Sequence, residues 1–510
     1  MHRAQCSGSH LCIDVLVAAA LAIWFNDRAN VCIFDRTLVP VLHHTGVAMT
    51  AEPEAAPRLH QPTIATIRRL SGPVMVLAGQ GIQSVGTFLI GALLARFASV
   101  AALGDYALGA TVLFLVGSMA ETLVATPYTY LVLRARTQRS QGIVFGAAIM
   151  ATIVLTVFGG AAASALVVVI PGLGHLFPML PAALIMTLLR ELIRRRHYAH
   201  GEPGRALVLD VVTILVQFGF IIWMIATKRF DASSVFAAMA AACLVAILFA
   251  WPGLRQQVEF RPALLTRYCR HFFDIGRWLA LGGVCQIAAI QSFSWFLFFT
   301  SDARATGAFT ACLAISSLPN PFLVGLTNYA RPAIIRTYTE RGWAMLLRQT
   351  KWLAAAFVLP VLLFAAIAIV KGGWVLTLIY GPALQWAAGS LSWTILALVA
   401  IAAGAPLQLL MLAIHRPQAI FHLHVGEVVA TYVIGLPLVI WFGLIGAAIG
   451  YMMTALAGAA VLLALFLNEC RRRARTPATG TESEAFGSLT ATARVSQSAP
   501  AASAGPLPGR

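Results

Sequence analysis

Residues 143–170 read IVFGAAIMATIVLTVFGGAAASALVVVI, an apolar run that no charge interrupts. A helix of about 20 such residues crosses the roughly 30 Å of hydrocarbon in a bilayer. A strand of a membrane β-barrel needs about ten residues of strict alternation, which this continuous run does not show. The stretch therefore predicts a transmembrane α-helix.

Similar runs recur along the chain. They predict an all-α polytopic membrane protein with twelve spans after residue 70. The predicted spans are 74–95, 105–132, 143–170, 174–192, 206–226, 232–251, 278–300, 306–329, 352–370, 388–413, 419–441 and 443–467.

The composition excludes most other classes of protein. The 510 residues are 59% hydrophobic and 11% charged, and the mean hydropathy is +0.81. Soluble proteins have about 45–50% apolar and about 25% charged residues. So few charges cannot cover a soluble surface, which excludes a cytosolic enzyme, a secreted domain and a disordered chain.

The charges predict an orientation. Lys and Arg number 36 and Asp and Glu 19, an excess that fits either nucleic acid or a membrane surface. Most basic residues fall in loops on the side of Arg68 and Arg69. Few fall on the opposite side: Arg96, Lys228, Arg229, Arg304 and Lys371. This alternation follows the positive-inside rule and places both ends of the helical core in the cytoplasm. Because the basic residues are dispersed, nucleic acid is not an expected partner.

An internal repeat relates the two halves of the chain. With a shift of 203 residues, Gly79 matches Gly282, Gln83 matches Gln286, Gly104 matches Gly307, and Tyr106 matches Phe309; with a shift of 214, Pro203 matches Pro417. With an even number of helices, both halves begin on the same side. The axis relating them then runs along the membrane normal, a plan used by many transporters.

These patterns divide the chain into five parts. The apolar run 11–25 is short for a span, and Met49 is a candidate alternative start. The tail is rich in Ala, Ser, Thr, Gly and Pro, which predicts disorder. The predicted parts are a poorly structured extension (1–70), a six-helix bundle (71–252), a basic cytoplasmic connector (253–277), a second six-helix bundle (278–470) and a disordered cytoplasmic tail (471–510).

Four motifs carry a resemblance to a known family. They are IYGPA at 379–383 with WAA at 386–388, RPAIIR at 331–336 with ERG at 340–342, FGLIGAAI at 442–449, and LGDYA at 103–107. Over about residues 70–470 the chain resembles polysaccharide-export flippases of the multidrug/oligosaccharidyl-lipid/polysaccharide (MOP) exporter superfamily, and the branch of O-antigen-type lipid-linked oligosaccharide flippases fits best. The resemblance implies a V-shaped pair of six-helix bundles with a central cavity between helices 1, 2, 7 and 8.

The same resemblance implies a function. We expect a flippase that carries undecaprenyl-pyrophosphate-linked oligosaccharide repeat units across the bacterial inner membrane by alternating access, as a monomer and without a cofactor. Expected partners are the substrate, membrane lipids, a polysaccharide polymerase and a chain-length regulator. The alternatives are a cation-coupled multidrug exporter of the same superfamily and a membrane-embedded polymerase or glycosyltransferase. Short outer loops argue against an enzyme.

Polar residues inside the predicted spans are the candidate site, because polar groups that face lipid are costly. The cavity candidates are Gln83, Thr87, Glu121, Thr122, Gln286, Gln291, Asn320 and Asn328. Such side chains also hold helices together, which is the alternative interpretation. For Glu121 the options are a contact with substrate, coupling to a cation, and a pair with an arginine.

Two further groups complete the candidates. Arg96, Arg304 and Arg331 could bind a pyrophosphate through paired hydrogen bonds or anchor to lipid headgroups. None of the eight cysteines forms a C-x-x-C pair, so no metal site is expected. The histidines at 415, 422 and 424 fit an interface better than a metal centre.

Overall fold

The computed structural model describes residues 64–135, 137–254, 262–414, 416 and 418–475. Met49, most of the predicted extension and all of the predicted tail beyond Arg475 lie outside these residues. Every regular element of the described residues is helical, which confirms the all-α fold class. The chain forms two compact units, Met1–Leu462 and Leu463–Arg510. In the second unit Glu469 pairs with Arg472 and Arg473, at 3.4 and 2.9 Å.

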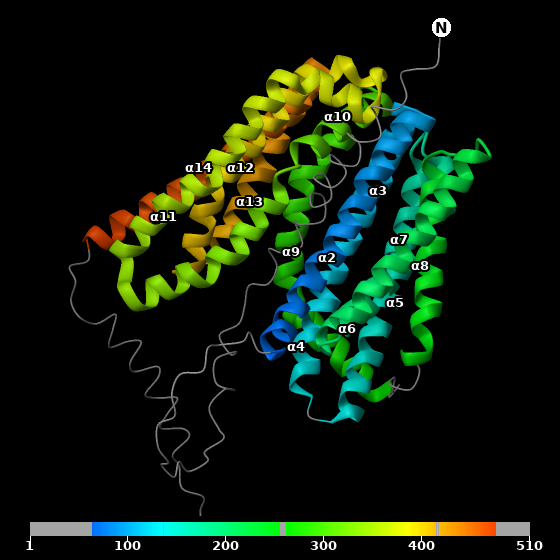
Figure 1. Cartoon of the computed structure of the whole chain (residues 1–510), viewed down its shortest axis with the longest axis horizontal. Coiled ribbons are helices and arrows are strands. Elements are labelled where there is room, and N and C mark those ends of the chain that lie inside the picture. Colours follow the sequence, from blue (N-terminus) through cyan, green and yellow to red (C-terminus); the bar gives the residue numbers. More distant parts are fainter. Residues whose placement is uncertain (1–63, 136, 255–261, 415, 417, 476–510) are drawn as a thin grey trace, which may run out of the picture. The chain divides into compact units, whose positions relative to one another are not determined.

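The first half contains six membrane-length helical stretches, some built from several elements (Figure 1). They are α2 (Ile64–Leu93) with the π-helix η2 (Leu94–Ala98); α3 (Val100–Ala120) with η3 (Glu121–Ala125) and α4 (Thr126–Arg134); α5 (Gln138–Val169); α6 (Met179–Ala199), preceded by η4 (Gly174–Leu176); α7 (Pro203–Ala226); and α8 (Ala232–Leu254).

The second half has longer elements because two of its helices each continue through a sharp bend. Its elements are α9 (Pro262–Thr300), α10 (Ala303–Ser316), α11 (Asn320–Tyr380), η6 (Pro382–Ala387), α12 (Ala388–Ala413), α13 (Gln418–Ala430), η7 (Thr431–Gly435) and α14 (Leu436–Arg475). Gly342 in α11 has φ 73° and Gly443 in α14 has φ 55°, values that glycine adopts most readily. Each of these helices therefore consists of two arms.

The bends account for the number of spans. Among the described residues, nine helical segments are long and apolar enough to cross a membrane. Two of them, 320–380 and 418–473, contain the bends at Gly342 and Gly443 and therefore count twice. With α6, which is less apolar because it carries several charges, the described residues form the twelve predicted spans, the eighth being α10 with the first arm of α11.

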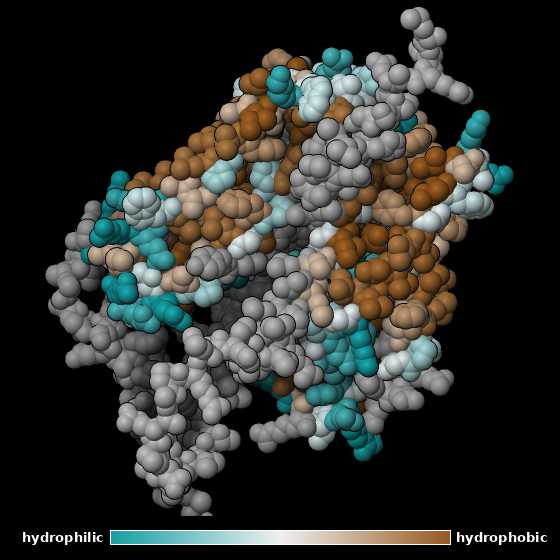
Figure 2. All heavy atoms as spheres, viewed as in Figure 1, coloured by the Kyte–Doolittle hydropathy of each residue, from teal (hydrophilic) through white to brown (hydrophobic). Residues whose placement is uncertain are grey.

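The surface fits a multi-pass membrane protein. Large apolar side chains such as Val169, Val370 and Trp441 are about three-quarters exposed, at 76%, 78% and 74%. On the face seen in Figure 2, hydrophobic side chains cover the middle of the helices and hydrophilic ones gather toward the ends. A solvent-exposed surface of this kind would be unfavourable in water, whereas hydrocarbon accepts it.

The helices of the first unit connect alternately at two ends. We call one the Ser99 end, which holds residues 96–99, 170–178, 227–231, 301–302 and 381–387. The other is the Arg134 end, which holds residues 134–135, 137, 200–202 and 416.

Two helices extend beyond their predicted limits at the Arg134 end. α9 begins at Pro262, inside the predicted connector, and Phe272 packs in a buried cluster with Tyr128 and Phe145 of the first half. α6 continues to Ala199, although the predicted span ended at residue 192. Arginines that the sequence assigned to a loop are therefore helical.

Candidate functional site

Three arginines and three acids meet inside the first half. Arg190, Glu191, Arg194 and Arg195 lie on α6, Glu121 on η3, and Asp210 on α7. All but Arg195 are buried. We call these six residues the ionic cluster. Its formal charges cancel, which matters because an unpaired charge in a low-dielectric interior is very costly.

The carboxylate of Asp210 contacts two arginines of the cluster and one glutamine of α2. Its side chain is fully buried, with 0% exposure. Nη1 of Arg190 lies 3.4 Å from Oδ1, and Nη1 of Arg194 lies 3.7 Å from Oδ2. Gln83 of α2 donates a hydrogen bond from Nε2 to Oδ1. One carboxylate therefore joins α2, α6 and α7.

The two glutamates of the cluster, Glu191 and Glu121, pair with Arg194 and Arg195. Glu191 Oε1 lies 2.6 Å from Nη2 of Arg194 and 3.2 Å from Nε of Arg195. Nη2 of Arg195 lies 2.9 Å from Glu121 Oε2. The side chain of Arg195 is 24% exposed, more than any other arginine of the cluster. Glu121 is therefore tied to α6 through the most accessible member.

The spacing on α6 explains how a single helix supplies four members. Arg190 and Arg194 are four residues apart and share one stripe of the helix, and Glu191 and Arg195 share the next. The first stripe meets Asp210 and the second meets Glu121. Gly79 of α2 gives Asp210 room, because a Cβ there would lie 2.7 Å from Asp210 Oδ2.

The cluster belongs to the first half alone. With the shift of 214 residues, the positions of Arg190, Glu191, Arg194 and Asp210 correspond to Gly404, Ala405, Gln408 and His424. His424 instead pairs with Glu427 within α13, with Nδ1 2.9 Å from Oε2. The two halves therefore share a fold but differ in their internal charges.

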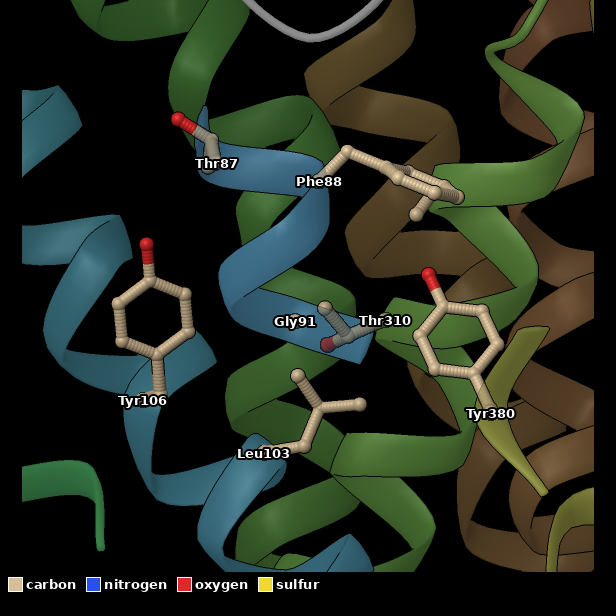
Figure 3. A pocket seen from close by; sticks show the side chains of 8 residues that line it. Thr87, Phe88, Gly91, Leu103, Tyr106, Thr310 and Tyr380 are labelled. Atoms are coloured by element: carbon tan, nitrogen blue, oxygen red, sulfur yellow. The ribbon is translucent and has the colours of Figure 1, made fainter. Parts of the chain in front are cut away.

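A small pocket lies between the two halves (Figure 3). Its volume is about 30 Å³, and its lining residues are Thr87, Phe88, Gly91, Leu103, Tyr106, Thr310, Ala314 and Tyr380. The rings of Phe88 and Tyr380 make an edge-on contact with centroids 6.2 Å apart. A water molecule needs about 10–15 Å³ of cavity volume measured in this way, so this volume corresponds to about two waters.

The predicted cavity residues fall in different places. Gln83 and Glu121 belong to the ionic cluster. Thr87 lines the pocket, and its hydroxyl donates to the carbonyl of Gln83 at 3.1 Å. Thr122 is fully buried, donates to the carbonyl of Ser118 at 2.8 Å, and contacts the position of Gly283 on α9. The placement of Thr122 is that of a residue between packed helices.

The remaining amide candidates lie on α9 and α11. Gln286 and Gln291 are half-buried on α9, and half-buried Asn320 begins α11. The side chain of Asn328 lies outside the described residues. Of the histidines near 420, His422 is exposed and bonds the carbonyl of Gln418 at 2.7 Å. In the described part of the chain, no group of three potential metal ligands comes together.

The three predicted phosphate contacts have different surroundings. Arg96 donates from Nε to the carbonyl of Ile379 at 2.7 Å. Arg304 lies at the Ser99 end with its Cζ 5.7 Å from the centre of the Trp386 ring. Arg331 is half-buried, and within the described residues its Nε has no hydrogen-bond partner. Arg96 and Arg304 lie at the Ser99 end and Arg331 lies on the first arm of α11, and their binding of a phosphate stays a prediction.

Sequence reasoning missed the arginines of α6. It interpreted Arg190, Arg194 and Arg195 as an orientation signal at the end of a span. The signal that could have found them is the pair of four-residue spacings together with two acids, Glu121 and Asp210, inside other predicted spans. Buried acids require counter-charges, and α6 offers them at helical spacing.

Comparison with known proteins identifies the fold. No family model and no curated protein matches the sequence. Among solved structures, an inward-facing multidrug resistance MATE family transporter of the MOP superfamily has a TM-score of 0.64 at 16% identity, covering 81% of this chain and 99% of that one. An outward-facing MATE family transporter has a TM-score of 0.54 at 15% identity, covering 80% and 96%.

A third solved structure comes from Pyrococcus furiosus. This MOP superfamily transporter, described by the reverse polarity of its binding pocket, has a TM-score of 0.54 at 14% identity and covers 79% of this chain and 94% of that one. The chain therefore has the fold of MATE-type transporters of the MOP superfamily.

Proposed function

We propose that the protein is an alternating-access exporter of the MOP type that moves a lipid-linked oligosaccharide with a pyrophosphate head group across a bacterial inner membrane. The observation that supports this most is the charge pattern inside the first half. Three arginines gather there, and each acid of the cluster lies within 4 Å of an arginine.

This pattern suits an anionic cargo better than a cationic one. An exporter that couples to a cation needs a carboxylate that can exchange its partner for that cation. Here Glu121, Glu191 and Asp210 already have guanidinium partners. Arg195 is also paired, with Glu121 and Glu191, but at 24% exposure it is the most accessible of the three arginines. It is therefore the arginine at which a phosphate can replace a carboxylate partner, in the paired geometry that arginine favours.

The proposed orientation follows the positive-inside rule, with the Arg134 end in the cytoplasm. At the opposite, Ser99 end, the pocket and the Phe88–Tyr380 contact join α2 to α11 of the second half. At the Arg134 end α9 packs against the first half through Phe272. The similarity is also higher to the inward-facing solved structure, at 0.64, than to the outward-facing one, at 0.54. We therefore propose that the structure represents an inward-facing state.

Reconstitution tests the proposal directly. Purified protein in proteoliposomes should move a short fluorescent undecaprenyl-pyrophosphate oligosaccharide between leaflets, and Arg195→Gln should slow this movement. In the cell, deletion of the gene should abolish surface polysaccharide and accumulate lipid-linked repeat units. Wild-type protein that leaves the fluorescent lipid in its starting leaflet would refute the proposed substrate class.

A second candidate is a cation-coupled multidrug exporter, which the fold similarity to multidrug MATE transporters favours. Asp210 Oδ2 supports it too, because within the described residues this buried atom has no hydrogen-bond partner. Expression in a drug-sensitive host separates the two: raised resistance that Asp210→Asn abolishes would favour the drug exporter.

A further inference from the structure

The two halves are joined at the Ser99 end by an arginine that binds the end of a helix in the opposite half. Arg96 lies in η2, directly after α2, and its side chain reaches the last turn of α11. Its Nε donates to the carbonyl of Ile379 at 2.7 Å, and its Nη2 donates to the carbonyl of Leu378. One guanidinium thus connects the first span with the ninth.

The sequence of α11 explains why these carbonyls accept an external donor. In a continuing helix the carbonyl of Leu378 would bind the N–H of residue 382, four positions on. Residue 382 is proline, which has no N–H, and Gly381 ends the helix with φ 94°. Arg96 supplies the missing donor, and its positive charge lies at the negative end of the helix dipole.

The repeat provides an internal comparison. The shift of 203 places Phe299 at the position of Arg96. Phe298, the residue before Phe299, lies close to the turn that follows α5. A Cβ built on Gly172 in this turn would lie 3.7 Å from the ring of Phe298. The pseudo-symmetric contact is therefore apolar and non-directional, while the Arg96 contact is made of directional hydrogen bonds. Of the two pseudo-symmetric contacts, the one made by Arg96 is therefore the one that depends on directional hydrogen bonds.

We infer that Arg96 is a latch that holds the Ser99 end closed and is released when the transporter opens there. This inference rests on the alternating access of the proposed function and not on the identity of its cargo. Opening must separate α2 from α11, which breaks both hydrogen bonds. Because Arg96 is exposed, water replaces the lost partners, so the latch biases the equilibrium without making it irreversible.

The experiment measures the separation of the halves. Spin labels at Phe177→Cys and Trp374→Cys, exposed positions near this end in opposite halves, report it by pulsed electron spin resonance in a background without the native cysteines. Arg96→Ala should move the distances toward longer values, with the ratio of open to closed molecules rising about tenfold, as the loss of two hydrogen bonds predicts.

Arg304→Ala is the matched control. It removes an exposed arginine at the same end, whose contact with Trp386 stays within the second half, so the distances should not change. Unchanged distances in Arg96→Ala, or an equal shift in Arg304→Ala, would overturn the inference. If Arg96→Ala does not fold, Phe88→Ala tests the same closure by removing the contact with Tyr380, and an unchanged distribution there would also count against it. Since no substrate is added, failure of oligosaccharide transport would leave this result standing.

Discussion

Gly104 and Gly307 occupy corresponding positions of the internal repeat and lie directly against each other where α3 crosses α10. A Cβ on Gly104 would be 1.9 Å from the carbonyl oxygen of Ala303, and a Cβ on Gly307 would be 2.0 Å from that of Val100. Val100 and Ala303 are also repeat partners, so the contact is symmetric. The axis that relates the halves therefore passes between the two glycines, and only glycine permits this approach.

The glycine contact predicts a strong effect of a single methyl group. Gly104→Ala should destabilise the protein by about 1–3 kcal/mol or more, because the added Cβ collides with rigid backbone. Gly219→Ala is the control: this exposed glycine of α7 has no atom within 4 Å of a built Cβ, and alanine there should stabilise the helix by about 1 kcal/mol. Thermal unfolding in detergent measures both, and equal melting temperatures for the two variants would contradict the crossing.

The neutrality of the ionic cluster predicts that breaking one pair is costly. Asp210→Asn keeps an acceptor for Gln83 but leaves an excess positive charge among Arg190 and Arg194, which should cost about 3–5 kcal/mol. Glu340→Gln is the control, because its pair with Arg336 is exposed and worth at most about 1 kcal/mol.

A charge-restoring variant sharpens this test. Arg194→Gln combined with Asp210→Asn returns the cluster to neutrality, so the double variant should lose less stability than the sum of the two single losses. Simple addition of the losses in a thermal-shift experiment would show that the charges act independently.

Glu121 and Thr122 are neighbours, but only the substitution of Glu121 is expected to reduce transport. Glu121→Gln removes the carboxylate that holds Arg195 and should reduce flipping of the lipid-linked oligosaccharide at least severalfold while expression is unchanged. Thr122→Val keeps the shape of a buried side chain whose hydroxyl bonds its own helix, so transport should stay near that of the wild type. The proteoliposome assay compares them. A loss in Thr122→Val with full activity in Glu121→Gln would reverse the assignment of the two residues.

The loop between α6 and α7 predicts a dependence on pH. Burial acts to raise the pKa of Glu202, but the hydrogen bond with His197 and the charge of Arg205 outweigh it, so this pKa lies below its usual value. A lowered pKa means that the ionised group stabilises the folded state above the unfolded pKa of 4.5 and that the contribution is lost as the pH falls through the folded value. Glu202→Gln should therefore lower the melting temperature more at pH 7 than at pH 3. An equal difference at the two pH values would contradict this origin.

Much of the fold follows from local sequence. Apolar length predicted the spans, and the prediction of twelve is confirmed once the bends at Gly342 and Gly443 are taken into account. The repeat also matches Gly104 with Gly307, which the structure brings into contact. The prediction failed most at the end of α6, because arginine lowers the hydropathy of a helix whether the side chain is exposed or buried among acids.

The sequence by itself determined how many times the chain crosses the membrane, since transfer of a side chain into hydrocarbon is a property of each residue summed along a run. Only the tertiary structure decided which polar residues act together. Glu121, Arg195 and Asp210 come from three different helices, and a buried charge is stable only through partners that other helices bring to it. The same holds for Arg96, whose acceptors lie at the end of α11 in the other half of the chain.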